Sequence, residues 1–269
     1  MNSIAFIGGG NMASAVIGGL IRNGHASDAL LVIDPGAGAR DKLQTEFGVR
    51  TLSRADTSLA HAAIVVWAVK PQFFKVAAAP CAAHLGHALH LSVMAGIRSD
   101  ALVRATGSER IVRTMPNTPA LVGLGMTGLY ARDAVSAADR AQVETVLAPT
   151  GPLLWVAREA DLDAVTALSG SGPAYVFYFV EAMMEAAAQM GLTPEQGKQL
   201  ALATFAGATA LAQASSDPPS LLRERVTSKG GTTFAALSSL EESGVKAAFV
   251  KALKAAQQRA RELGDEFGA

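Results

Sequence analysis

Over the first 156 residues, short apolar runs alternate with longer stretches in which apolar positions recur at helical spacing. Several runs are continuously apolar, which is typical of parallel strands covered on both faces. The alternation predicts an α/β fold with a doubly wound, mostly parallel sheet. We expect strands at Ile4–Ile7, Leu30–Asp34, Ala63–Val69, Ala88–Met94, Arg110–Met115, Met126–Ala131 and Pro152–Val156, with helices between them such as Asn11–Asn23, Gly38–Phe47 and Ser136–Ala148.

After Val156 the strand pattern stops and helical spacing continues to the end of the chain. Pro173, Pro194 and Pro218 each stand at an expected helix start, where the missing N–H of proline is harmless. We therefore expect an α/β domain over residues 1–156 and an all-α domain over residues 157–269. The expected helices are Asp161–Leu168, Pro173–Met190, Pro194–Ala214, Pro218–Val226, Thr232–Glu242 and Val245–Phe267.

Composition narrows the class of protein. The 269 residues are half hydrophobic, and 23 basic side chains balance 23 acidic ones, so no net charge attracts nucleic acid or an acidic membrane. The single cysteine, Cys81, excludes an internal disulfide framework and fits a reducing compartment. No signal peptide precedes Gly8, and the apolar run from Ala174 is too short to span a bilayer. We expect a cytoplasmic protein without membrane or nucleic-acid partners.

A glycine-rich turn, GGGNMA at residues 8–13, directly follows the first expected strand. Gly8 permits the tight turn, Gly10 lets the backbone approach a pyrophosphate, and Ala13 lets the helix pack closely on the strand. The next helix directs its free N–H groups and positive dipole end at the phosphates. Asp34 follows at about the spacing of a ribose-binding acid. This context favours dinucleotide binding over an ordinary glycine turn.

Three further segments lie at expected strand ends, where open α/β sheets bind ligands. Lys70, in AVKPQ, is expected either to contact the cofactor or to be a solvated loop lysine. Ala95 and Gly96 would let a flat ring lie against the backbone, or form a simple turn. Asn117, between two prolines in MPNTP, is expected to form a wall of the site rather than only a turn.

In the second half, Gly230 and Gly231 precede an expected helix and expose consecutive backbone N–H groups, which suit a carboxylate. The hydroxyl of Thr233 can donate and accept a hydrogen bond. The simpler interpretation is a helix cap, and the loop can serve as a helix cap and as a carboxylate site at once.

The SGSGP segment at residues 169–173 is either a tight helix corner or a close approach of another chain. No Cys, His and Asp cluster has metal-ligand spacing, so we expect no metal.

Together the segments IGGGNMA, AVKPQ, RTMPNTPALVGLG, DAVTALSGSGPAYVF and VTSKGGTTFAAL resemble the pyrroline-5-carboxylate reductase family over the full length. The resemblance implies a Rossmann-type domain followed by an all-α dimerisation domain that interlocks with a second subunit, with dimers often forming decamers. It implies NAD(P)H-dependent hydride transfer to the C=N bond of 1-pyrroline-5-carboxylate, which gives L-proline in the last step of proline biosynthesis.

The resemblance also assigns residues. Thr233 is the expected catalytic contact, to the ring nitrogen, and the backbone at Gly231 and Thr232 would hold the carboxylate. Lys229, where the family usually has proline, and Arg225 depart from the family pattern, with an effect that stays open. Substrate contacts are expected at Glu159, Ser228, Gly230, Gly231, Thr232 and Thr233, and cofactor contacts at Gly8, Gly10, Asn11, Met12, Asp34, Arg40, Ala68, Val69, Lys70, Pro71, Ala95, Gly96 and Asn117.

Cofactor preference depends on Asp34 and Arg40. An acid at the end of the second strand usually binds the ribose 2′-hydroxyl of NADH. Because Pro35 follows, an alternative is that Asp34 caps the next loop and Arg40 meets a 2′-phosphate. We expect NADPH, as the family often prefers it, with NADH as the alternative.

The residues leave two alternative functions. A β-hydroxyacid dehydrogenase or imine reductase is the nearest alternative, but the former rely on a central-helix lysine, and the chain has no lysine between Val76 and Gln196. An NADP-binding sensor would need neither the GGTT loop nor the MPNTP loop. The number of subunits, feedback inhibition by proline and the use of a related imine stay open.

Overall fold

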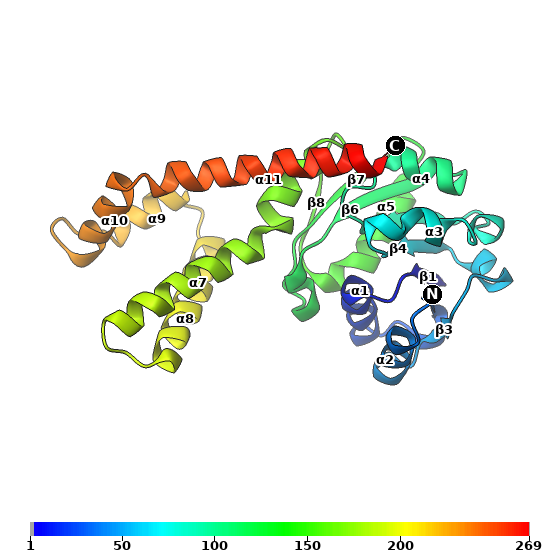
Figure 1. Ribbon diagram of the computed structural model, residues 1–269, viewed down its shortest axis with the longest axis horizontal. Helices are drawn as coiled ribbons and strands as arrows, with labels where there is room; N and C mark the ends of the chain where they lie inside the picture. Colours follow the sequence, from blue (N-terminus) through cyan, green and yellow to red (C-terminus); the bar gives the residue numbers. More distant parts are fainter. Residues whose placement is uncertain (1–2, 269) are drawn as a thin grey trace. The chain divides into compact units, whose positions relative to one another are not determined.

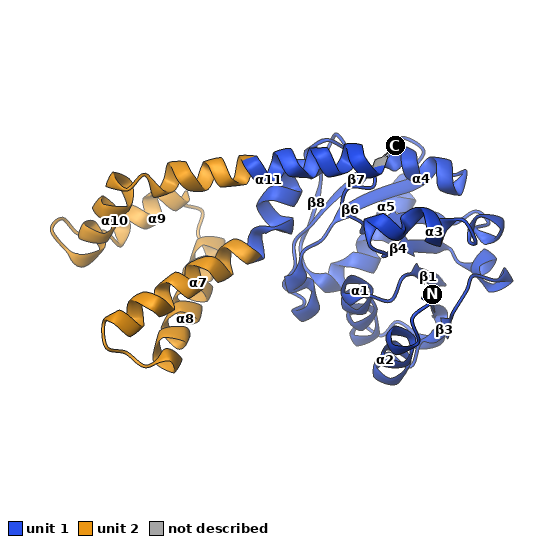
Figure 2. Ribbon diagram, in the orientation of Figure 1, with its two compact units in different colours: residues 1–173, 255–269 blue, residues 174–254 orange. Residues whose placement is uncertain are grey.

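The computed structural model describes residues 3–268, which fold into two compact units coloured separately in Figure 2. Unit 1 runs up to Pro173 and includes the residues from Ala255 onward, and unit 2 is Ala174–Lys254.

Unit 1 contains an eight-stranded sheet in the order β3-β2-β1-β4-β5-β6-β7-β8 (Figure 1). All neighbouring strands are parallel except β6 and β7, which are antiparallel. The chain builds outward from β1 to β3 and then returns to β4, so the expected α/β, doubly wound, mostly parallel fold is confirmed. The strands are β1 (Ile4–Ile7), β2 (Leu30–Ile33), β3 (Arg50–Leu52), β4 (Ile64–Trp67), β5 (Leu89–Ser92), β6 (Ile111–Met115), β7 (Thr127–Ala131) and β8 (Leu153–Trp155).

Alternate strand residues point to opposite faces of this sheet, and in β1, β2 and β4 every residue is buried. Helices therefore cover both faces. Phe6 belongs to a core with α1, α2 and α5, whereas Ala5 and Ile7 belong to a core with α3 and α4. The helices of unit 1 are α1 (Asn11–Arg22), α2 (Ala37–Phe47), α3 (Phe74–Ala78), α4 (Ser99–Thr106), α5 (Ala137–Leu147) and α6 (Asp161–Val165).

Unit 2 is helical. Helix α8 starts with Pro194 at its first position, and Thr193 and Gln196 form a reciprocal capping box there. Many large apolar side chains of unit 2 are exposed, among them Phe177, Tyr178, Leu200 and Leu211. Such surface is typical of a protein interface. The helices are α7 (Gly172–Gln189), α8 (Pro194–Ala214), α9 (Pro219–Arg225), α10 (Thr232–Glu242) and α11 (Val245–Gly268), of which α11 ends in unit 1.

The compact units differ from the domains expected at residues 1–156 and 157–269, whose outermost residues 1, 2 and 269 lie outside the described part. Helix α6 packs against β6 and β7, and the last turns of α11 also belong to the sheet unit. The helix expected at Asp161–Leu168 ends as an α-helix at Val165 and continues as a π-helical turn, Thr166–Gly170. The short strand β3 was not expected.

Candidate active site

The turn between β1 and α1 requires glycine at Gly8. Its φ is +101°, a left-handed conformation that side chains rarely adopt, and a Cβ there would lie 2.7 Å from the carbonyl oxygen of Ala68. The backbone N–H of Ala68 donates to Ile7 O at 2.8 Å. The glycine turn and the AVKPQ segment are therefore in direct contact, as the adjacent positions of β1 and β4 predict.

Gly10 leaves an open cradle at the start of α1. It is exposed, and a Cβ at this position would meet no atom within 4 Å. As the N-cap of α1 it provides no side-chain cap, and the first turn carries no acidic residue. The first N–H groups of the helix, from Asn11 and Met12, thus have no side-chain acceptor at the cap. This geometry fits a pyrophosphate.

The Asp34 carboxylate accepts hydrogen bonds from backbone groups of the turn and of the loop that follows β2. Its Oδ2 accepts the N–H of Gly9 and its Oδ1 accepts the N–H of Gly36, both at 2.8 Å. Arg40 Nη1 donates to the backbone oxygens of Asp34 at 2.7 Å and Pro35 at 2.9 Å. Asp34 therefore caps the loop, as one of the two interpretations held, and Arg40 sits beside the same loop.

The other cofactor candidates follow neighbouring strands. Lys70 is exposed and precedes Pro71, the first residue of a 3-10 turn just after β4. Ala95 and Gly96 follow β5, the next strand in the sheet, and are half-buried. Asn117 follows β6, and its amide is engaged: it donates to Ser169 O at 3.1 Å and accepts from Met126 N at 2.8 Å. Asn117 therefore ties the MPNTP loop to the SGSGP segment.

Glu159 is held by groups of unit 1. Its Oε1 lies 2.6 Å from Arg113 Nη1, and its carboxylate accepts the N–H and the hydroxyl of Ser99, both at 2.6 Å. Burial raises the pKa of the Glu159 carboxyl, but Arg113 and Ser99 outweigh it, so the pKa lies below its ordinary value. A charged Glu159 thus caps the start of α4.

The remaining substrate candidates lie in unit 2, in the loop before α10. Gly230 has a φ of +74°, the N–H of Gly231 donates to Ser228 O at 3.0 Å, and α10 begins at Thr232 without a side-chain cap. Lys229 in this loop is exposed. The structure therefore gathers the cofactor candidates and Glu159 within unit 1, and Ser228, Gly230, Gly231, Thr232 and Thr233 within unit 2.

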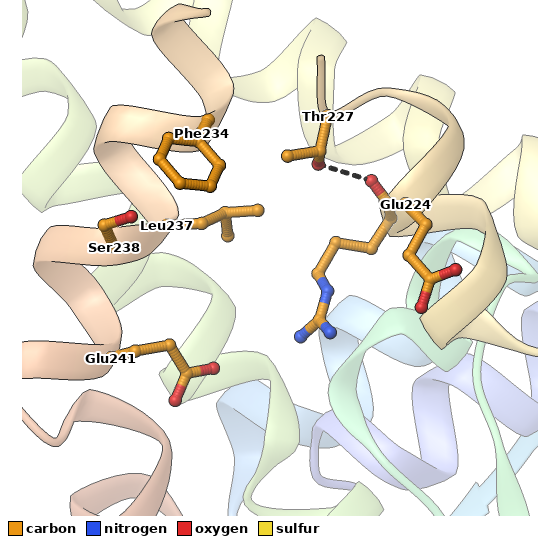
Figure 3. Close-up of a pocket in the computed structure, with 7 residues that line it drawn as sticks. Glu224, Thr227, Phe234, Leu237, Ser238 and Glu241 are labelled. Atoms are coloured by element: carbon orange, nitrogen blue, oxygen red, sulfur yellow. Dashed lines mark hydrogen bonds between the residues drawn. The ribbon is translucent and has the colours of Figure 1, made fainter. Parts of the chain in front are cut away.

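A separate hollow of about 310 Å³ lies between α9 and α10 of unit 2 (Figure 3). Thr227 Oγ1 donates to Arg223 O at 2.6 Å at one wall, and Phe234 faces it from α10. None of the expected substrate residues lines it. Arg225, which departs from the family pattern, pairs with Asp217. The lining residues are Arg223, Glu224, Thr227, Phe234, Leu237, Ser238 and Glu241.

The polar network around Arg113 was not expected from the sequence. This arginine is only 5% exposed, in the middle of the strand sequence IVRTM. A charged residue inside an otherwise apolar strand signals a buried partner. Its partner Glu159 is 46 residues away.

Residues 3–268 contain no group of three or more His, Cys, Asp or Glu side chains arranged to hold a metal. No helix of that described part is long and apolar enough to cross a membrane.

The doubly wound sheet and the open phosphate turn at its strand reversal define a dinucleotide-binding protein of the Rossmann class. Residues 3–96 match the family described as NADP oxidoreductase, coenzyme F420-dependent, and residues 159–263 match the family described as pyrroline-5-carboxylate reductase dimerisation.

The relatives are more specific. The chain is 43% identical to the pyrroline-5-carboxylate reductase of Pseudomonas aeruginosa over 98% of both chains, and 35% identical to that of Escherichia coli over 97% of both. Among solved structures it is similar to the enzyme of Coxiella burnetii, with a TM-score of 0.91, 37% identity and coverage of 97% and 98%. It is also similar to the NADP-bound enzyme of Plasmodium falciparum, with a TM-score of 0.87, 30% identity and 98% coverage of both chains. The chain belongs to the pyrroline-5-carboxylate reductase family.

Proposed function

We propose that this chain reduces the C=N bond of 1-pyrroline-5-carboxylate with a hydride from NADPH and so forms L-proline, in the last step of proline biosynthesis. The observation that carries the proposal is the 43% identity to a pyrroline-5-carboxylate reductase over 98% of the chain. The open cradle at Gly10 supports it independently, because its geometry suits a dinucleotide pyrophosphate.

The cofactor would lie along the carboxyl edge of the sheet. Gly8, Gly10, Asn11 and Met12 would hold the pyrophosphate, and Arg40 would face the ribose end. The segment Ala68–Pro71, with Ala95, Gly96 and Asn117, would line the path to the nicotinamide. When bound, the cofactor supplies the hydride, and the protein supplies its orientation.

The substrate would be held by the loop before α10. The backbone N–H of Thr232 would bind its carboxylate, since it lies at a helix start without a side-chain cap. The N–H of Gly231 would join it by exchanging its present hydrogen bond to Ser228 O for one to the carboxylate. Ser228 and Gly230 would shape this loop, and Thr233 would hydrogen-bond the ring nitrogen. A protonated cyclic imine is already an electrophile, so no side-chain acid is required. Alignment of this kind is worth about 7–11 kcal/mol.

Glu159 would lie beside the bound substrate. Its carboxylate is occupied by Arg113 and Ser99. We therefore expect it to hold α4, which follows the Ala95–Gly96 loop, in addition to any contact with substrate.

The protein would act as a homodimer in the cytoplasm. The dimerisation-family match over residues 159–263 and the exposed apolar side chains of unit 2 support a second copy. Assembly of dimers into a decamer is the larger state that we propose to test. The partner would supply the substrate loop to each cofactor site.

The test mixes the purified protein with 1-pyrroline-5-carboxylate and, in parallel, NADPH or NADH, and follows the near-ultraviolet absorbance of the reduced nicotinamide. L-Proline is measured by chromatography as the product. Oxidation that requires the substrate and yields one proline per nicotinamide supports the proposal. No oxidation by folded protein that still binds NADPH would contradict it, and would favour a different imine substrate or an NADP-binding sensor.

A further inference from the structure

The loop after β5 is fixed from two sides, and one side is the C-terminal end of α11. Gly96 in this loop has a φ of +74°, and a Cβ there would lie 3.2 Å from Leu263 O and 3.3 Å from the Phe267 ring. The backbone of the loop therefore lies directly against the last turns of α11. Phe267 also packs on the buried cluster that contains Met94.

Arg98 joins the loop to this helix. Its Nη2 donates to Arg261 O at 3.4 Å and pairs with Asp265 at 3.3 Å. Its Nη1 lies 3.9 Å from Asp163 of α6. One guanidinium thus connects the loop with two helices of unit 1.

Gly264 makes room for this guanidinium. A Cβ at Gly264 would lie 2.6 Å from Arg98 Nη2, 2.7 Å from Cζ and 2.9 Å from Nε. The whole planar group therefore lies over the helix at its only glycine in this turn, and any side chain there would displace it.

The opposite side of the loop is held at Ser99, directly after Arg98. Glu159 accepts the Ser99 N–H and hydroxyl at 2.6 Å each. With Ser99 fixed to Glu159 and Arg98 fixed to α11, the path of the loop through Ala95 and Gly96 is defined at its exit.

We propose that Arg98 is a positioning residue for hydride transfer, which fixes the loop Met94–Arg98 against α11 and so sets the place of the nicotinamide. The inference rests on the proposed function, in which Ala95 and Gly96 lie at that ring. Arg98 touches neither cofactor nor substrate in this account and acts through the loop.

The test is a single-turnover experiment with the full-length protein. Enzyme loaded with NADPH is mixed with 1-pyrroline-5-carboxylate in a stopped-flow instrument, and the rate constant of nicotinamide oxidation is measured with normal and C4-deuterated cofactor. This rate constant does not depend on the fraction of folded enzyme, which changes only the amplitude. In Arg98→Met we expect it to fall roughly 10- to 100-fold, as for a misplaced reacting group, with NADPH affinity retained.

Gly264→Ala provides a second variant. It keeps Arg98 but displaces its guanidinium, and alanine favours a helix more than glycine does. We expect a lower rate constant without loss of thermal stability. Arg259→Met is the matched control: it removes an arginine of α11 that pairs with Glu262 and Glu266 of the same helix, and should leave the rate constant unchanged.

An unchanged rate constant in Arg98→Met, or a loss of amplitude alone, overturns the positioning role while the proposed function stands. Failure of the unaltered protein to oxidise NADPH overturns the proposed function and this inference with it.

Discussion

Arg113 and Glu159 form a largely buried ion pair, with 2.6 Å between Nη1 and Oε1 and side-chain exposures of 7% and 21%. Ser99 adds two hydrogen bonds to the same carboxylate. The three residues come from β6, from α4 and from the segment before α6, so the pair joins parts of unit 1 that are distant in sequence.

Removing the carboxylate should be costly because it leaves a buried positive charge without a partner. We expect Glu159→Ala to lower the free energy of unfolding by about 3 kcal/mol. The double variant Arg113→Met with Glu159→Leu should recover part of this loss. Urea denaturation measures both, and a loss from Glu159→Ala as small as that of a surface pair would contradict the prediction.

Two glycines of the phosphate turn should respond differently to alanine. Gly10→Ala has free space and should fold with a stability change of at most about 1 kcal/mol, yet weaken NADPH binding by calorimetry. Gly8→Ala places a Cβ against Ala68 O at a positive φ and should lose at least about 2 kcal/mol of stability. Unchanged NADPH affinity in Gly10→Ala would show that the pyrophosphate binds elsewhere.

Arg40 should decide between the two cofactors. If it meets a 2′-phosphate, Arg40→Ala should raise the KM for NADPH roughly tenfold, the value of about one charge-assisted hydrogen bond, and leave that for NADH unchanged. Lys42→Ala, an exposed position on the same helix, is the control. Equal weakening of both cofactors would mean that Arg40 only supports the loop through its hydrogen bonds to Asp34 and Pro35.

Thr233→Ala should lower kcat and weaken substrate binding while cofactor affinity stays close to normal. The reason is that the Thr233 hydroxyl would stabilise the ring nitrogen of the substrate, whereas the phosphate turn would bind the cofactor. Steady-state kinetics and NADPH calorimetry measure the two effects. Thr233→Ser, which keeps the hydroxyl, is the control, and an equal loss of cofactor affinity would count against the role.

Acid should destabilise the protein through His90. Burial, with a smaller effect of Arg110, lowers the pKa of His90 from 6.5 to about 4, and Trp67 Nε1 donates to its Nδ1 at 3.2 Å. The unfolded chain therefore binds the proton first, and stability of up to about 3 kcal/mol is lost as the pH falls from 6.5 to about 4.

Thermal unfolding across this range should show the loss as a falling Tm. His90→Gln keeps an acceptor for Trp67 and should flatten the decline, whereas the exposed His87→Gln should not. A decline of the same slope in His90→Gln would assign it to the carboxylates instead.

Much of the fold follows from apolar patterning. Short apolar runs, several of them continuous, located β1, β2 and β4 to β8, and a proline located the start of α8. The strand β3, Arg50–Leu52, was missed because it is a three-residue strand at the sheet edge with an exposed arginine and no apolar run. The antiparallel direction of β7 depends on pairing with β6, which no local pattern encodes.

The site was predictable only where it is local. The phosphate turn and the role of Asp34 as a loop cap depend on residues close in sequence. The contacts of Arg98 do not: its partner Asp265 is 167 residues away, and both side chains look like ordinary surface charges in the sequence. Such pairs arise from the packing of α11 on the sheet unit, which patterning does not specify.

Both tryptophans of the chain, Trp67 and Trp155, belong to unit 1. Trp67 is fully buried with its ring edge-on to Phe74, and Trp155 Nε1 donates to Glu144 at 2.6 Å. Intrinsic tryptophan fluorescence is therefore an optical signal of the sheet unit alone, whereas far-ultraviolet circular dichroism also records the helices of unit 2. A gap between the two melting curves would reveal the units losing their structure separately, without any added label.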